Sequence, residues 1–198
     1  MATPARVQDT IERQRPVDPA SFKSAMRQLV GGVTVITAGR GQDISGMTVT
    51  SFASFTADPP SVVVSVNRES SSWPLIERYR AFGANVLASG QLDMAKRFTS
   101  QSGLAGATRF QAIEWRSKAT GAPLLVNSLV SLDCELCRFI EFHSHMLLVG
   151  NVVAVDMSSK CGGSLAYWNG QYVNVDSNEE LRLMTEVSIP TARALREI

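Results

Sequence analysis

Strand-forming segments follow one another along most of this chain, and this order is the strongest constraint on its fold. Apolar runs bounded by glycine, proline and serine predict strands over residues 33–37, 44–55, 61–66, 82–87, 128–141, 145–156 and 171–175. Helical patterns are confined to residues 18–30, to a segment that starts near residue 73, and to residues 92–100. Strands and helices do not alternate regularly, and no G-x-G-x-x-G follows a strand, so a parallel nucleotide-binding sheet is disfavoured. The sequence predicts a mainly β protein with short helices, built as an antiparallel barrel or sandwich.

The first helix has a defined start and one apolar face. Asp18 is a good cap for free backbone N–H groups, and Pro19 suits the first helical position. Apolar residues then recur at helical spacing, at Phe22, Ala25, Met26, Leu29 and Val30. Gly31 and Gly32 are predicted to end this helix.

Size and charge limit the possible functions. The chain has 198 residues and a net charge of +1, from 19 Lys and Arg against 18 Asp and Glu. This fits one domain and offers no basic block for nucleic acid or an anionic membrane. We expect a mobile arm over residues 1–17, a domain over residues 18–176, a C-terminal tail over residues 177–198 and a cytoplasmic location. The tail is apolar enough to pack on a partner subunit or over a nucleotide site.

The run from Ser45 to Pro60 carries short hydroxyl groups among strand-forming residues. On a continuous strand, alternate side chains share a face. One face would hold Thr48, Thr50, Phe52 and Ser54, and the other Val49, Ser51, Ala53 and Phe55. Such a surface suits a polyhydroxylated or phosphorylated ligand, but an ordinary hydroxyl-rich edge strand would look the same.

Other polar residues could share a ligand with this run. Ser70, Ser71 and Ser72 precede a helix, where hydroxyls and free N–H groups suit a phosphate or serve only as a cap. Asn67 and Asn85 are amides in otherwise apolar strands and need partners if buried. The backbone would supply those partners, or a heterocycle such as a flavin would.

Histidine and cysteine are few. His143 and His145 lie at the junction of two predicted strands, and no third ligand for a metal can be placed beside them. Cys134 and Cys137 are three residues apart on a predicted strand and therefore face opposite sides, which suits buried thiols better than a shared metal. We expect no metal site.

Several motifs occur in a specific order between Phe22 and Val175. They are Gly32–Val35, the Gly-Met-Thr-Val-Thr-Ser-Phe run and its two prolines over Gly46–Pro60, Val66–Ser72, Asn85–Leu87 with Gln91 and Phe98 after it, and Gly121–Leu125. In this order and at this spacing the chain resembles the short-chain flavin reductase family. These proteins are FMN-binding split barrels that act as reductase components of two-component flavin monooxygenases.

One motif departs from the family pattern. The family usually has Gly-Asp-His before the glycine of the next strand; here His145 keeps its place before Gly150, but His143 and Ser144 replace the glycine and aspartate. This leaves open how the imidazole is oriented and whether NADH or NADPH is preferred.

The resemblance implies a Greek-key-like split β-barrel that forms a homodimer, with FMN or FAD at the subunit interface. It implies cofactor contacts along the hydroxyl run, the next strand, the serine segment and the pocket beyond it, at Met47, Thr48, Val49, Thr50, Ser51, Ser65, Val66, Asn67, Ser71, Ser72, Asn85, Gln91 and Phe98. Ser71 and Ser72 would meet the phosphate.

The resemblance also implies a reaction, the transfer of hydride from nicotinamide C4 of NADH or NADPH to flavin N5. His145 would bind or polarise the nicotinamide, and reduced flavin would diffuse to a partner monooxygenase. Two alternatives stay open. One is a flavin store or sensor without nicotinamide turnover, and the other is an enzyme that resembles pyridoxamine-phosphate oxidase.

Overall fold

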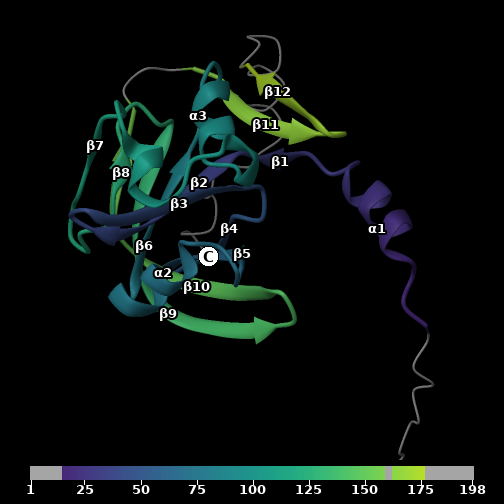
Figure 1. Cartoon of the computed structure of the whole chain (residues 1–198), viewed down its shortest axis with the longest axis horizontal. Coiled ribbons are helices and arrows are strands. Elements are labelled where there is room, and N and C mark those ends of the chain that lie inside the picture. The colour runs from purple at the N-terminus through teal and green to yellow at the C-terminus, as the bar shows by residue number, and fades with distance from the viewer. Residues whose placement is uncertain (1–14, 159–161, 177–198) are drawn as a thin grey trace, which may run out of the picture.

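The computed structural model describes residues 15–158 and 162–176 (Figure 1). The helices are α1 (Pro19–Met26), α2 (Trp73–Tyr79) and α3 (Leu92–Arg97), with 3-10 turns η1 (Ser100–Ser102) and η2 (Gly106–Phe110). The strands are β1 (Gly31–Gly32), β2 (Thr34–Arg40), β3 (Asp43–Val49), β4 (Ala53–Ala57), β5 (Pro60–Asn67), β6 (Ala81–Val86), β7 (Trp115–Arg116), β8 (Leu124–Leu125), β9 (Val130–Phe142), β10 (His145–Met157), β11 (Ser164–Trp168) and β12 (Gln171–Val175).

Most strands belong to one antiparallel sheet of seven strands, in the order β3-β2-β6-β9-β10-β5-β4. A second sheet joins β1, β11 and β12, and β7 pairs with β8. The mainly β, antiparallel prediction is confirmed. The long strands predicted over residues 128–141 and 145–156 are present as β9 and β10.

The two edge strands of the large sheet are neighbours in the sequence. Only residues 50–52 connect β3 at one edge to β4 at the other. A fully extended link from residue 49 to residue 53 reaches about 14 Å. The edges of a flat seven-stranded sheet would lie about 28 Å apart. The sheet must therefore curl until its edges approach, an arrangement compatible with a split barrel.

This connection corrects the prediction of one strand over residues 44–55. Val49 still pairs with Thr34 of β2, whereas Ala53 pairs with Val63 of β5, so the chain changes partners between them. The Ser51 hydroxyl donates to the Ser65 carbonyl at 2.7 Å within the link. Because the strand is broken, the expectation that Thr48, Thr50, Phe52 and Ser54 share one strand face is wrong.

The interior is divided into two apolar clusters on either side of β2. We call the first the barrel cluster; its buried members include Ile36, Val64, Ile76, Phe82 and Leu148. We call the second the outer cluster; its buried members include Val33, Val35, Leu87, Phe98 and Leu165. Successive side chains of β2 enter different clusters, so this strand is buried on both faces.

Helix α1 begins where the sequence predicts and ends earlier. The Asp18 carboxylate accepts hydrogen bonds from the N–H groups of Ala20 and Ser21, both at 2.9 Å. Hydrogen bonding by the Ser21 side chain and N–H, and less by the Ala20 N–H, lowers the pKa of Asp18. The helix ends at Met26, so the predicted extension to residue 30 is wrong. The helix projects away from the sheets, and its apolar side chains are exposed (Figure 1).

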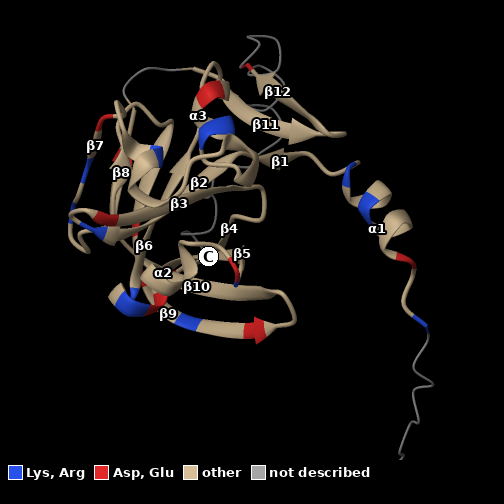
Figure 2. Cartoon of the chain, viewed as in Figure 1, with Lys and Arg blue, Asp and Glu red and all other residues tan. Residues whose placement is uncertain are grey.

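Figure 2 shows charged residues of both signs on α2, α3 and β9, whereas β1, β4, β11 and β12 carry none. Cys134 is buried and Cys137 is exposed. Burial, and to a lesser extent Asp133, raises the pKa of the Cys134 thiol to about 12. No helix in residues 15–158 and 162–176 is long and apolar enough to cross a bilayer. The predicted tail, and all of the predicted arm except residues 15–17, lie outside the described residues.

We expect Gly150→Ala to lower the free energy of unfolding by about 1–3 kcal/mol, because overpacking a filled core is costly. A methyl group at this position would lie 2.5 Å from Cζ of the fully buried Phe82. Gly32→Ala is the matched control, since no atom lies within 4 Å of its added carbon. Urea unfolding of the three proteins measures the effect, and equal stability of the two variants would contradict it.

Candidate functional site

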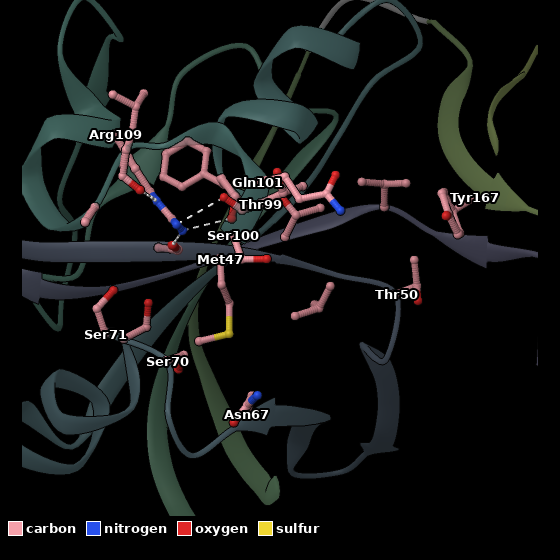
Figure 3. Close-up of a pocket in the computed structure, with 18 of the residues that line it drawn as sticks. Met47, Thr50, Asn67, Ser70, Ser71, Thr99, Ser100, Gln101, Arg109 and Tyr167 are labelled. Atoms are coloured by element: carbon pink, nitrogen blue, oxygen red, sulfur yellow. Dashed lines mark hydrogen bonds between the residues drawn. The ribbon is translucent and has the colours of Figure 1, made fainter. Parts of the chain in front are cut away.

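A cavity of about 1050 Å³ lies along the free edge of β3 (Figure 3). Its floor is β3 from Gly46 to Val49, continuing into Thr50. One wall is the segment that follows α3, residues 98–105, and the other is the segment between β5 and α2, residues 67–72. Tyr167 and Tyr172 of the β11–β12 hairpin line one end.

The floor holds its own backbone in place. The Thr48 N–H donates to the Phe98 carbonyl at 3.1 Å, and the Thr48 hydroxyl donates to the Ala95 carbonyl at 2.7 Å. Both bonds tie β3 to α3 and the segment after it. The Met47 side chain points into the cavity in Figure 3, and Thr50 lies further along the floor.

Arg109 fixes the wall above the floor. Its Nη1 donates to the carbonyls of Gly46 at 2.6 Å and Phe98 at 2.9 Å. Its Nη2 donates to Thr99 at 3.1 Å, and its Nε donates to Leu104 at 2.9 Å. One guanidinium thus joins β3 to both ends of the wall. Burial lowers the pKa of Arg109, but a guanidinium stays charged at neutral pH.

Three serines form the opposite wall and differ in how their hydroxyls are used. The hydroxyl of Ser71 lies 2.7 Å from that of Ser45 on β3, and the Ser72 hydroxyl donates to Ser45 at 3.2 Å. The Ser70 hydroxyl is buried and has no hydrogen-bond partner among the described residues. A buried polar group without a partner is costly, and this hydroxyl is covered by protein rather than open to the cavity.

The end formed by Tyr167 and Tyr172 is aromatic. The two rings are cross-strand partners, with centroids 5.1 Å apart in an edge-to-face arrangement. Burial, and secondarily Tyr167, raises the pKa of Tyr172, so its hydroxyl is a neutral hydrogen-bond donor at pH 7.

Most of the predicted contact residues line this one cavity. They are Met47, Thr48, Val49, Thr50, Asn67, Ser71, Ser72 and Phe98. They come from β3 and its continuation, the end of β5, the approach to α2 and the end of α3, so the structure brings together residues that are far apart in the sequence.

The other predicted contacts lie elsewhere. Val66 is buried in the barrel cluster, and Ser51 is bonded to the carbonyl of Ser65. The Gln91 side chain accepts from the Ala88 N–H at 2.8 Å. None of these residues, nor Asn85, lines the cavity.

Asn85 is fully buried, and the protein satisfies its amide. Its Nδ2 donates to the Val35 carbonyl at 3.0 Å and to Thr37 at 3.2 Å. Its Oδ1 accepts from the Leu125 N–H at 2.8 Å and from the Ser131 hydroxyl at 2.9 Å. The sequence left open whether the protein or a ligand satisfies a buried amide here. The structure shows that the protein satisfies the amide of Asn85.

His145 lies at the tip of the β9–β10 hairpin, beside the cavity. It is exposed and is paired across the sheet with Asn67, which lines the cavity. Its Nδ1 is 2.9 Å from the Ser144 hydroxyl. The residue that replaces the family's aspartate therefore contacts the imidazole directly.

Sequence reasoning missed several lining residues as parts of a site, namely Thr99, Ser100, Gln101, Leu104, Ala105, Arg109, Tyr167 and Tyr172. Arg109 had one signal, a cation in the otherwise apolar or small-residue stretch from Leu104 to Phe110. The tyrosines had none, because aromatic residues are common in strands.

Comparison with known proteins gives a consistent result. A family model described as flavin reductase like domain matches residues 26–176. The chain is 31% identical over 155 residues to FMN reductase (NADH) RutF of Klebsiella pneumoniae (strain 342), covering 78% of this chain and 93% of that protein. It is 29% identical over 161 residues to HsaB of Mycobacterium tuberculosis (strain CDC 1551 / Oshkosh), the reductase subunit of a flavin-dependent monooxygenase, covering 81% and 84%. Among solved structures, BorF, the flavin reductase component of a bacterial two-component tryptophan halogenase, matches with a TM-score of 0.74 and 28% identity, covering 81% of this chain and 100% of BorF.

We expect Asn85→Ala to lower the free energy of unfolding by roughly 2–4 kcal/mol, because it leaves several buried groups without partners. Asn151→Ala is the control, since the Asn151 side chain makes no hydrogen bond with the described residues and its loss should cost less than about 0.5 kcal/mol. Urea unfolding compares the two. A loss below about 1 kcal/mol for Asn85→Ala would show that these bonds contribute little.

Proposed function

We propose that this chain, which belongs to the flavin reductase-like domain family, is an NAD(P)H-dependent flavin reductase that supplies reduced FMN or FAD to a partner monooxygenase. The match over residues 26–176 and the names of the relatives support the reaction. The proposal of a partner monooxygenase is supported by two relatives: HsaB is the reductase subunit of a flavin-dependent monooxygenase, and BorF is the flavin reductase component of a two-component halogenase. The observation that carries the proposal is that most of the predicted flavin contacts line one and the same cavity.

The cavity is large enough for a flavin mononucleotide, and its lining offers both polar and apolar surface. Its volume of about 1050 Å³ exceeds the common upper size of small-molecule pockets. The serine wall offers hydroxyl donors that suit a phosphate. Met47 and Val49 supply apolar surface on the floor for a flat ring.

A bound flavin would supply the hydride acceptor at N5, and a reduced nicotinamide the hydride. The protein's task is then to orient two rings and exclude water, which needs no general base. The bonds from Thr48 to Phe98 and Ala95 hold the floor rigid, so the ring would meet a preformed surface. Arg109 keeps the wall above it at a constant distance.

His145 would bind or polarise the nicotinamide. Its cross-strand partner Asn67 lines the cavity, so its backbone lies about 5 Å from a cavity residue. The contact between Nδ1 and the Ser144 hydroxyl limits rotation of the ring and directs Nε2 away from Ser144. A hydroxyl thus orients the imidazole where the family usually has a carboxylate.

We also propose that two copies form a homodimer through the exposed face of the β9–β10 hairpin. On this face Ile140 is 58% exposed, its cross-strand partner Leu147 is 39% exposed, and Phe142 is 69% exposed. The opposite face carries the buried Met146 and Leu148, so the strands are apolar on both sides. A contiguous apolar surface of this kind favours protein contact. Because His145 shares this face with Phe142, the dimer would place the cavity mouth near the interface.

The curled seven-stranded sheet supports the split-barrel architecture that the sequence resemblance implied. A cytoplasmic location stays a prediction from the sequence.

The purified protein is expected to oxidise NADH or NADPH only when free FMN or FAD is added. Steady-state absorbance at 340 nm with each nucleotide against each flavin measures this. Tight retention of flavin through gel filtration without turnover would instead support a flavin store or sensor.

We expect His145→Ala to raise the KM for the nicotinamide nucleotide by about tenfold, since it removes one hydrogen bond to the substrate. The Kd for flavin should change less than about twofold. His143→Ala is the matched control, because His143 lies on the same hairpin turn but lacks the contact to Ser144. An unchanged KM in His145→Ala would show that His145 does not contribute to nicotinamide binding.

Ile140→Glu is expected to shift the protein from dimer to monomer in sedimentation velocity, because it places a charge in a desolvated interface. Val175→Glu is the control, since Val175 is similarly exposed, at 51%, but belongs to β12. A dimer that survives Ile140→Glu but not the control would move the interface to the other sheet.

A further inference from the structure

The N-terminal helix α1 presents an apolar face that nothing in the described part of the chain covers. Phe22 and Met26 lie one turn apart on this helix and are 54% and 44% exposed. Leu29 and Val30, in the segment that follows, are 64% and 63% exposed, and no residue of the helix is buried. Ser24 lies on the opposite face, since successive helical residues are about 100° apart. An exposed apolar patch of this kind marks a contact with another molecule.

The helix is held in this position by the small sheet beside it. The Asn169 N–H, at the turn of the β11–β12 hairpin, donates to the Arg27 carbonyl at 2.8 Å. Directly after this point, β1 pairs with β11 in antiparallel register. The helix could fold back over its own molecule only by breaking these backbone hydrogen bonds. Its apolar face is therefore directed outward, where another molecule can reach it.

A second copy of this chain offers a matching surface on its β9–β10 hairpin. The apolar face of this hairpin, formed by Ile140, Phe142 and Leu147, is also exposed. Three side chains are far fewer than the roughly 20–30 residues that each side of a stable interface contributes. In Figure 1, α1 and the tip of this hairpin lie on the same side of the molecule. A two-fold axis between them would place α1 of each copy on the hairpin of the other, in two equivalent contacts.

The charges beside the two surfaces are of opposite sign. Lys23 and Arg27 flank the apolar face of α1 and form no ion pair with the described residues. Glu69 is exposed and likewise has no ion pair within the described part of the chain. It lies beside the hairpin turn, because the N–H of the preceding Arg68 donates to the Ser144 carbonyl at 3.0 Å. Opposite charges at the rim of two surfaces favour and orient their association.

We propose that α1 of each copy packs across the β9–β10 hairpin of the other, so that the two copies exchange helices in the homodimer. The inference rests on the proposed homodimer and names the segment that completes its interface. Because His145 shares the hairpin face with Phe142, each helix would lie beside His145 of the partner subunit. The mouth of each cavity would then be formed by both copies.

Phe22→Glu tests the helix, and Ile140→Glu tests the hairpin. Both residues are more than half exposed and glutamate is a good helix former, so each variant should fold like the wild type. Each change should raise the dimer Kd at least about a hundredfold, because it buries an unpaired charge in both contacts. Ser24→Glu is the matched control, since it adds the same charge on the opposite face of α1, and its Kd should equal that of the wild type.

The decisive measurement is sedimentation velocity of an equimolar mixture of the two variants. A mixed dimer brings the intact α1 of the Ile140→Glu copy onto the intact hairpin of the Phe22→Glu copy, so one of its two contacts is undamaged. The mixture should therefore form dimers at a concentration at which each variant alone is monomeric. If α1 pairs with α1, or hairpin with hairpin, every contact of the mixed dimer is damaged. A mixture that stays monomeric would therefore overturn the proposal.

A Phe22→Glu variant that dimerises like the wild type would also overturn the proposal, because another segment or another protein would then cover α1. A wild-type protein that is monomeric at every concentration contradicts the proposed homodimer as well. Flavin-dependent oxidation of NADH or NADPH is measured on the same wild-type protein. A failure of the proposed reaction is thus distinguished from a failure of this contact.

Discussion

The short link of residues 50–52 is the constraint on which the rest of the structure depends. It joins the two edge strands of a seven-stranded sheet, and so it allows only a strongly curled sheet. Curling gives the sheet an inside, where the barrel cluster packs, and an outside that is left partly apolar on β9 and β10. It also leaves the far edge of β3 without a strand partner.

That free edge is where the cavity forms. An unpaired strand edge must be protected, because its N–H and C=O groups would otherwise pair with another chain. Here the edge is covered by a loop and a side chain. The Thr48 N–H donates to Phe98, and the Gly46 carbonyl accepts from Arg109. The cavity lies beside this covered edge, where β3 meets the segments of residues 98–105 and 67–72.

The sequence predicts well those features that depend on residues close together in the chain, and poorly those that depend on distant contacts. The strands β9 and β10 were predicted to within two residues, because their patterning is long and needs no knowledge of the rest of the chain. The start of α1 was predicted because Asp18 acts on N–H groups two and three residues away. The break after Val49 was missed, because strand-forming residues continue through it and only the change of partner strand reveals it. Most of the flavin contacts that the family resemblance implied line the cavity, because the resemblance is carried by the order of several motifs along the chain.

The residues that could not be predicted depend on contacts distant in sequence. Asn85 was correctly judged to need partners, but those partners come from three other segments of the protein. Arg109 contacts carbonyls of the segment 98–105 and the carbonyl of Gly46, which is 63 residues away, so no short sequence window contains its role.

The division of the interior into two clusters has a thermodynamic consequence. The cavity is bordered by Met47 and Val49, which pack on the barrel cluster, and by Phe98 and Tyr167, which belong to or pack on the outer cluster. A ligand seated there is in contact with both, so it adds buried apolar area that neither cluster has alone. Binding of a ligand in the cavity would therefore raise the cooperativity of unfolding, since the barrel cluster and the outer cluster would unfold together. In a protein that releases its ligand at every turnover, the two clusters would be strongly coupled while the ligand is bound and weakly coupled after its release.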